Sequence, residues 1–480
     1  MTVVESKELI DAKRAVKAPF DLRLRLADGA TETITIVEIF RLLPSKRIVA
    51  RAKYKGDDVL AKIFLGKTAN RHAQKENEGI ELFEVAGVQS PKRLFEAQFI
   101  DGDGVVLGFQ FLENSVSLEA KWNDADEDAE RVDVLTRAMI IIARLHNQGV
   151  VQTDIHLGNF LMSEGRIYTI DGGAVVRKTN PPLPTKDSLE NVSWFFAQLF
   201  PKYDEFVDIV LPAYEAIRLW KPDPDRIGRL KEQIARSRDA RKKSFLDKTF
   251  RDCTRFVSHS RLSRFLVCER ESYDNELKDL LEDIDDHIDK GTILKQGNTA
   301  TVAQVNLVDR AFVVKRYNIK GFWHGVRRAF SRTRASKSWA NAFHMEFLGI
   351  PSLKPVALME RRFGPLRGTA YLITEFVEGP DASAYLTNRS HFNGEVEALV
   401  GILVGLSENR ISHGDMKATN FLMALNGPII IDLDAMRQHK SEEKFQRAFS
   451  RDIRRFMRNW DNEPNVAARF QKILPKTCDN

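Results

Sequence analysis

Two stretches of the chain repeat one spacing of polar residues that could bind a phosphoryl group and a metal ion. Each has an aspartate, an asparagine five residues later and a second aspartate twelve residues after that. The first stretch supplies Asp154, Asn159 and Asp171, and the second supplies Asp415, Asn420 and Asp432. Phosphoryl transfer needs a carboxylate at the acceptor hydroxyl and hard oxygen ligands for magnesium. The repeated set predicts that chemistry.

A lysine in a strand-like apolar segment precedes each set. Lys62 lies in residues 59–64 and Lys315 in residues 312–317. A single strand lysine is more often a solvent-facing side chain. The order of lysine, aspartate, asparagine and aspartate, found twice, instead matches the protein-kinase pattern, in which the lysine holds the phosphates. We therefore expect ATP and Mg²⁺ as cofactors.

The two sets belong to an internal repeat. The equivalent aspartates and asparagines are 261 residues apart, and Gly87 and Gly349, each at a predicted turn, are 262 apart. Correlated landmarks at nearly one offset indicate duplication. We predict an α+β fold with two protein-kinase-like domains in tandem, each with a β-rich N-lobe and a reduced helical C-lobe. The predicted boundaries are residues 18–215, a helical connector at 216–288, and residues 289–480.

Two further nucleotide contacts are less clear from the sequence. A helix glutamate should pair with the strand lysine, and in the first half Glu76 or Glu78 could serve, of which we favour Glu76. In the second half that stretch begins at Ser338, and only Glu346 lies nearby. Gly297 could cover the nucleotide or simply form a hairpin turn.

Composition excludes several classes of protein. The net charge of +6 is mild for 480 residues, so nucleic acid is not an expected partner. The three cysteines are scattered and show no metal-binding spacing, which suggests a reducing compartment. Residues 1–17 lack a signal-peptide apolar stretch. We expect a cytoplasmic protein, and the sequence does not indicate its oligomeric state.

From Leu294 to about Arg437 the sequence resembles the lipopolysaccharide core kinase family, the Kdo/heptose kinases. The resemblance rests on Lys315-Arg-Tyr, Gly349-Ile-Pro, His413-Gly-Asp and Ile431-Asp-Leu-Asp, in the family order. It implies an acceptor-side role for Asp415, metal binding by Asn420 and Asp432, phosphate binding by Lys315, and a second phosphate contact by Lys417. The implied reaction is phosphorylation of a heptose or Kdo hydroxyl of the lipopolysaccharide inner core, at the cytoplasmic face of the inner membrane.

The first half looks like a more distant copy. Gln152-Thr replaces His-Gly, His156 stands at the position of Lys417, and Asp171-Gly-Gly replaces D-F-G. We therefore expect the second half to be the surer catalyst. A tandem kinase/pseudokinase scaffold or regulator of lipopolysaccharide assembly remains the alternative, as does another small-molecule kinase of the aminoglycoside or choline type.

The acceptor is expected to be a small molecule or glycolipid, because neither metal aspartate is followed by an A-P-E segment. The stretch Arg310–Met345 carries nine Lys or Arg residues and no acid, with aromatic residues such as Trp323 among them. Interleaved bases and aromatics suit an anionic glycolipid or an anionic membrane surface, although a solvated basic face or an RNA contact would look the same. We expect peripheral binding to the inner membrane.

Overall fold

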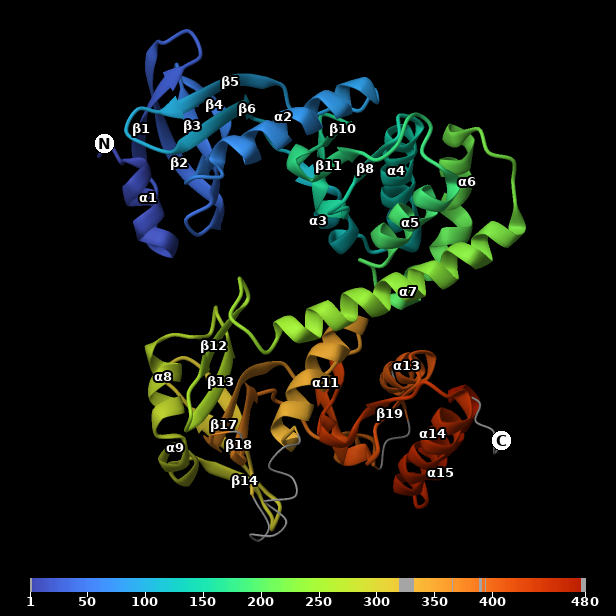
Figure 1. The fold of residues 1–480 in the computed structure, drawn as a ribbon. Helices are drawn as coiled ribbons and strands as arrows, with labels where there is room; N and C mark the ends of the chain where they lie inside the picture. Colours follow the sequence, from blue (N-terminus) through green and yellow to red (C-terminus); the bar gives the residue numbers. More distant parts are fainter. Residues whose placement is uncertain (1, 319–331, 365, 388–390, 393, 476–480) are drawn as a thin grey trace. The chain divides into compact units, whose positions relative to one another are not determined.

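A computed structural model describes residues 2–318, 332–364, 366–387, 391–392 and 394–475. The chain divides into two compact units, Met1–Arg238 and Asp239–Asn480. The division falls inside one long helix, α7 (Pro224–Lys248), which ends the first unit and begins the second (Figure 1). Each unit contains an antiparallel sheet followed by a mainly helical part, so the predicted α+β class is confirmed.

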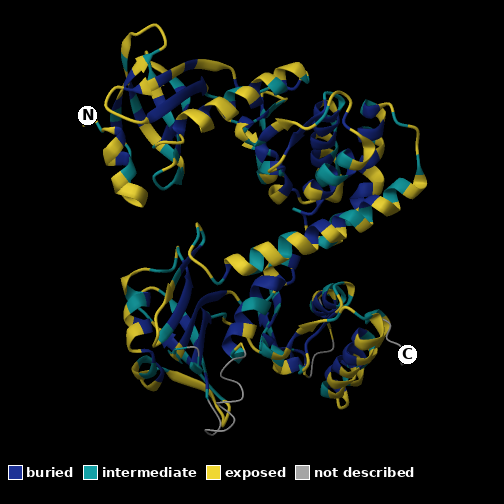
Figure 2. Ribbon diagram, viewed as in Figure 1, coloured by how far each residue is buried: buried dark blue, intermediate teal, exposed yellow. Residues whose placement is uncertain are grey.

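The first unit begins with helix α1 (Ser6–Ala12) and a closed antiparallel barrel in the order β1-β2-β3-β4-β6-β5. Its strands are β1 (Phe20–Leu26), β2 (Thr31–Leu43), β3 (Arg47–Tyr54), β4 (Asp57–Leu65), β5 (Arg93–Phe99) and β6 (Gly104–Gln110). Alternate side chains point into the barrel, as Leu22 and Leu24 of β1 do. Helix α2 (Ala69–Val85) connects β4 to β5. The barrel interior is therefore a separate small core (Figure 2).

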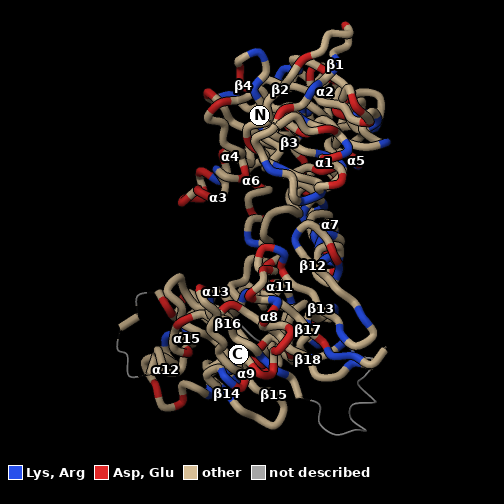
Figure 3. Tube along the Cα trace, turned by 90° about the vertical axis from the view of Figure 1, so that its left-hand side faces the viewer, with Lys and Arg blue, Asp and Glu red and all other residues tan. Residues whose placement is uncertain are grey.

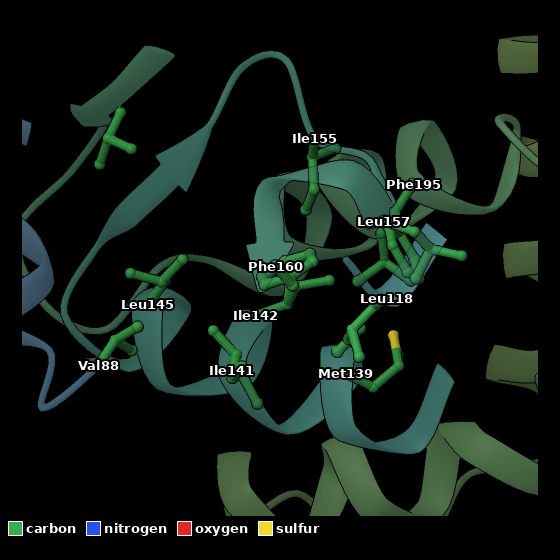
Figure 4. Packing of buried hydrophobic residues seen from close by; sticks show 14 of the residues in the cluster. Val88, Leu118, Met139, Ile141, Ile142, Leu145, Ile155, Leu157, Phe160 and Phe195 are labelled. Atoms are coloured by element: carbon green, nitrogen blue, oxygen red, sulfur yellow. The ribbon is translucent and has the colours of Figure 1, made fainter. Parts of the chain in front are cut away.

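The helical part of the first unit packs around helix α4. Its elements are β7 (Val116–Ser117), α3 (Leu118–Asp124), α4 (Asp128–Asn147), β8 (Val150–Gln152), β9 (Phe160–Ser163), β10 (Arg166–Thr169), β11 (Val175–Arg177), α5 (Thr185–Phe196) and α6 (Val207–Arg218). Met139 and Ile142 of α4 belong to one buried cluster with Ile155, Leu157 and Phe160 of the segment after β8, and Phe160 lies beside Ile142 (Figure 4). This buried contact fixes the loop that carries Asp154 and Asn159, because apolar residues flank both polar ones.

The second unit has an open sheet of seven strands in the order β12-β13-β17-β18-β16-β15-β14. The strands are β12 (Phe256–Ser260), β13 (Arg264–Glu269), β14 (Thr292–Gln296), β15 (Ala300–Asn306), β16 (Ala311–Tyr317), β17 (Pro355–Phe363) and β18 (Leu366–Glu375). One face packs on α8 (Asn275–Glu282) and α9 (Ile284–Lys290), and the other on α11 (Arg334–Leu348). The central strands of the sheet are thus covered on both faces, whereas the edge strand β14 is exposed.

The helical part of the second unit follows the same order as in the first. Its elements are α12 (Ala382–Leu386), α13 (Glu395–Glu408), β19 (Ile411–Ser412), β20 (Phe421–Ala424), β21 (Gly427–Ile430), β22 (Arg437–Gln438), α14 (Glu442–Met457) and α15 (Pro464–Ile473). The strand register repeats as well. Ser412 pairs with Arg437, and Val151 pairs with Val176 at the same 261-residue offset.

Residues 216–288 were expected to form a helical connector, but they include β12 and β13, which are two strands of the second sheet, as well as α8 and α9. The abundance of charged residues in this range favoured a helical prediction, although it contains short apolar strand segments such as Phe265–Cys268. In the described part of the chain, no helix has the length and apolar character to cross a bilayer.

Candidate active sites

In the first unit, the strand lysine forms a buried ion pair with the helix glutamate that we favoured. Lys62 Nζ of β4 contacts Glu76 Oε1 of α2, and the two side chains are 10% and 1% exposed. Glu78, the other candidate, is exposed and accepts a hydrogen bond from Gln74 on its own helix. Helical spacing explains the difference, since residues two apart face different directions.

Glu76 also fixes the loop after the metal aspartate. Its two carboxylate oxygens accept hydrogen bonds from the backbone N–H groups of Gly172 and Gly173, each at 3.0 Å. Helix and loop approach closely here, because a Cβ on Gly79 would lie 1.9 Å from the carbonyl oxygen of Gly172. Glycine at these positions therefore permits the contact that joins lysine, helix and loop.

The asparagine of each set closes its loop in the same way. Asn159 Nδ2 donates to the carbonyl oxygen of Asp154 at 2.6 Å, and Asn420 Nδ2 donates to that of Asp415 at 2.8 Å. Because the amide nitrogen makes this bond, the side-chain oxygen points elsewhere and is the atom that suits a metal. The five-residue spacing seen in the sequence is thus the length of one hydrogen-bonded turn.

The metal aspartates share an uncommon backbone conformation. Asp171 has φ 66° and ψ 58°, and Asp432 has φ 60° and ψ 55°. A non-glycine residue in the left-handed region is costly and clusters at functional sites. Each carboxylate also meets a cation, Arg47 at 3.5 Å from Asp171 and Lys315 at 2.5 Å from Asp432.

The change from His413 to Gln152 between the two units preserves a hydrogen bond. His413 Nε2 lies 3.0 Å from the carbonyl oxygen of Ile431, and Gln152 Nε2 donates to that of Ile170 at 3.1 Å. Both carbonyls belong to the residue before the metal aspartate. Since Asp415 N contacts His413 Nδ1, the histidine proton is assigned to Nε2. The first unit's departure from His-Gly-Asp therefore keeps the loops connected.

Among the described residues of the second unit, Lys315 has no glutamate partner. Ser338 replaces it and contacts Tyr317 Oη at 3.4 Å, while Glu346 pairs with Arg255 instead. Lys315 binds Asp432 directly. Burial would by itself lower the pKa of Lys315, but the influence of Tyr317 and Asp432 outweighs it and raises the pKa.

The same ion pair acts on the metal aspartate. Burial alone would raise the pKa of Asp432, but the charge and hydrogen bond of Lys315 hold it below its ordinary value. Helix α11 is joined to the loop after Asp432 by a basic helix residue and an acidic loop residue, whereas in the first unit the helix residue is the acid. Arg334 at the start of α11 donates to Asp434 Oδ2 at 2.7 Å, where the first unit uses Glu76 and the Gly173 N–H.

Asp415 is held between two cations. Lys417 Nζ donates to its Oδ2 at 3.2 Å, and Arg455 Nη2 of α14 lies 2.5 Å from its Oδ1. The loop backbone is fixed by Asp452, which is buried on α14 and accepts hydrogen bonds from the N–H groups of His413, at 2.7 Å, and Gly414, at 3.1 Å. Sequence reasoning missed both α14 residues. The 261-residue offset offered a signal for Asp452, because it aligns this residue with Asn191 of the first unit. Asn191 is also polar and holds the equivalent loop, since its side-chain amide donates to the Gln152 carbonyl.

A cavity of about 360 Å³ lies between barrel and helical part in the first unit and brings most of its predicted residues together. The predicted residues that line it are Lys62, Glu76, Asn159 and Asp171, with His156 from the same loop. Apolar side chains such as Leu60 and Phe109 form other parts of its wall, as in a nucleotide site. Asp154 is exposed and has no side-chain partner among the described residues.

Gly297 lies in the hairpin turn between β14 and β15. Its N–H donates to the carbonyl oxygen of Ala300 at 3.1 Å. Within the described residues no hydrogen bond joins it to Lys315 or Asp432. The plain turn accounts for its observed contacts, and covering a nucleotide stays a prediction.

The donor atoms in each unit fit magnesium bound together with a nucleotide. Across the described ranges, no cluster of three or more His, Cys, Asp or Glu side chains forms a preformed metal site. Asn420 offers its side-chain oxygen, and Asp432 Oδ2 accepts no hydrogen bond from a described residue. Two hard oxygens suit Mg²⁺ when phosphate oxygens and water complete the octahedron.

The comparisons with known proteins agree with the second unit's geometry. Residues 288–475 match the family described as Lipopolysaccharide kinase (Kdo/WaaP). The family resemblance and the prediction that the protein is a kinase are thereby confirmed. No curated protein matched the chain.

Proposed function

We propose that this chain, whose residues 288–475 belong to the lipopolysaccharide kinase (Kdo/WaaP) family, transfers the γ-phosphoryl group of ATP to a sugar hydroxyl of the lipopolysaccharide inner core. The acceptor sugar is a heptose or Kdo, and the reaction takes place at the cytoplasmic face of the inner membrane. The single observation that carries the proposal is the contact of Lys315 with Asp432 beside the Asp415–Asn420 loop, inside the matched region.

Each residue of the second unit has a role that follows from its contacts. Asp415 accepts the hydrogen bond, and then the proton, of the attacking hydroxyl. The hydroxyl oxygen bonds to the γ-phosphorus as the bond from that phosphorus to the bridging oxygen breaks, and the bridging oxygen leaves with ADP. Asn420 and Asp432 would hold Mg²⁺, which when bound neutralises charge on the phosphates. Lys315, now paired with Asp432, reaches the nucleotide phosphates when these compete for its ammonium group. Lys417 adds a second cation beside Asp415.

The first unit is proposed to be a second kinase-like domain that binds Mg-ATP. The intact pair of Lys62 and Glu76 and the cavity between barrel and helical part support nucleotide binding. The repeat of Asp415 as Asp154 and the hydrogen bond of Gln152 support turnover, while His156 in place of Lys417 favours slower chemistry. The alternative is a pseudokinase that organises lipopolysaccharide assembly.

Asp415→Asn and Asp154→Asn test both proposals in one assay. Phosphate transfer from ATP to lipopolysaccharide core should fall about 10²–10⁴-fold in Asp415→Asn, because the base is lost while the shape of the side chain is kept. Asp154→Asn, the matched substitution in the other unit, should have a smaller effect, and withholding Mg²⁺ should stop transfer in both. Wild-type turnover by folded Asp415→Asn would contradict the role of the second unit.

We also propose that the basic stretch binds the anionic membrane surface. Residues 319–331 of this stretch, which include Trp323, Arg327 and Arg328, lie outside the described residues. In the described part, four of its bases form ion pairs rather than a free basic face: Arg310 with Asp274, Lys315 with Asp432, Arg316 with Asp285 and Arg334 with Asp434. The proposal of membrane binding therefore rests on bases outside these four pairs, such as Arg327 and Arg328.

A further inference from the structure

A second cavity, of about 420 Å³, adjoins the Asp415 loop of the second unit. Its lining residues are Ser412, Gly414, Ala435, Arg437, His439, Ala448, Arg451, Asp452 and Arg455. Arg451 and Arg455 are one helical turn apart on α14 and face the same side, and Arg437 comes from β22. Three guanidinium groups from two elements thus converge on one hollow.

Two of the three arginine charges of this cavity are uncompensated among the described residues, whereas Arg455 pairs with Asp415. In the part of the chain that the structure describes, neither Arg437 nor Arg451 has a carboxylate within ion-pair distance. The acidic lining residue, Asp452, already accepts hydrogen bonds from the N–H groups of His413 and Gly414, and burial raises its pKa. Both signs of charge are spread over the whole chain (Figure 3), so a hollow with three arginines and one engaged acid differs from its surroundings.

The fold itself does not require these arginines, as the first unit shows. At the 261-residue offset, Val176, Glu190 and Trp194 stand at the positions of Arg437, Arg451 and Arg455. The register of β11 on β8 repeats that of β22 on β19, so the backbone is equivalent. Lys178, the remaining base there, pairs with Asp187 at 2.9 Å and with Glu190 at 3.5 Å. In the first unit the single base at these positions is neutralised by carboxylates, whereas the second unit gathers three arginines there.

We propose that this arginine cavity binds an anionic group, a phosphate or a carboxylate, carried by the acceptor sugar next to the hydroxyl that is phosphorylated. The inference rests on the proposed function and narrows its substrate to an already acidic sugar. Arg455 links the two places, because it lines the cavity and lies 2.5 Å from Asp415 Oδ1. Guanidinium forks match the planar carboxylate and the phosphate in geometry.

Binding of inorganic phosphate and of acetate to the full chain tests the cavity without turnover. The variant Arg437→Gln/Arg451→Gln should weaken binding of the preferred anion at least ~10-fold by calorimetry, since two charge-assisted contacts are lost. The matched control, Lys444→Gln/Arg447→Gln, removes the same charge from exposed positions on α14 and should bind as wild type. Phosphate bound near Lys315 contributes equally to both and cancels.

The proposal is overturned if the cavity variant binds the anion as tightly as the wild type does. It is also overturned if the control variant loses as much affinity as the cavity variant, because the net charge of the protein would then explain the loss. Preference for phosphate over acetate identifies a phosphorylated acceptor, and the reverse identifies a carboxylate such as that of Kdo. On lipopolysaccharide core, the cavity variant should raise KM at least ~10-fold with a smaller change in kcat, and an unchanged KM overturns the acceptor role. Arginine-dependent phosphate binding by an inactive wild-type protein would refute the proposed function and leave the anion site standing.

Discussion

The buried pair of Lys62 and Glu76 allows a sharp test of how the first unit holds its site. Glu76→Gln keeps the size of the side chain but leaves the Lys62 ammonium without its counter-ion at 10% exposure. Removing one partner of a buried pair costs about 3–5 kcal/mol. The amide can also accept from only one of the two N–H groups that Glu76 now binds, those of Gly172 and Gly173.

Hydrogen exchange followed by mass spectrometry measures this cost where it arises. At about 1.4 kcal/mol per factor of ten, a loss of 3–5 kcal/mol should speed exchange of the peptide containing Gly172 and Gly173 by about 10²–10³-fold or more, up to the limit set by global unfolding. Glu78→Gln is the matched control on the same helix. Its side chain is exposed and bonded only to Gln74 among the described residues, so exchange should change little.

A third variant separates charge from shape. Glu76→Gln/Lys62→Met removes the uncompensated ammonium, and protection of Gly172 should recover in part, because the penalty of the single variant is mainly a buried unpaired charge. The reasoning would be refuted if Glu76→Gln exchanged like Glu78→Gln. It would also be refuted if the double variant were no better protected than the single one.

Two more predictions concern acid stability and membrane binding. Burial lowers the pKa of His146 to about 3, so below about pH 6.5 only the unfolded chain takes up that proton, and the first unit should lose up to about 1.4 kcal/mol of stability per pH unit. In thermal melting, His146→Gln should show a weaker dependence of stability on pH. Identical slopes for the variant and the wild type would exclude His146 as the source of the dependence. Arg327→Gln/Arg328→Gln should weaken the free energy of binding to anionic vesicles by about 2 kcal/mol at low salt, as measured by sedimentation with the vesicles. Arg334 is left intact because it pairs with Asp434. Unchanged sedimentation would contradict the membrane proposal.

Contacts within a short segment could be predicted from the sequence. Asn159 follows Asp154, and Asn420 follows Asp415, by five residues, so the repeated spacing indicated that each pair shares one short loop. The hydrogen bond from the asparagine amide to the aspartate carbonyl was seen only in the structure. The mixed fold was visible for the same reason, since strand and helix periodicities are local. Short, charge-flanked strands such as β12 were not, and residues 256–269 were expected to be helical although they complete the second sheet.

Contacts between distant segments were decided by packing. The sequence offered Glu76 and Glu78, of which Glu76 was favoured, and the packing of α2 against β4 determines that Glu76 is the partner of Lys62. It gave no sign that Arg334 would bind Asp434, 100 residues later, after Ser338 had removed the glutamate. The choice of partner depends on which side of a helix is buried against which loop. That choice is a property of the assembled layers, because the residues that make it share no spacing along the chain.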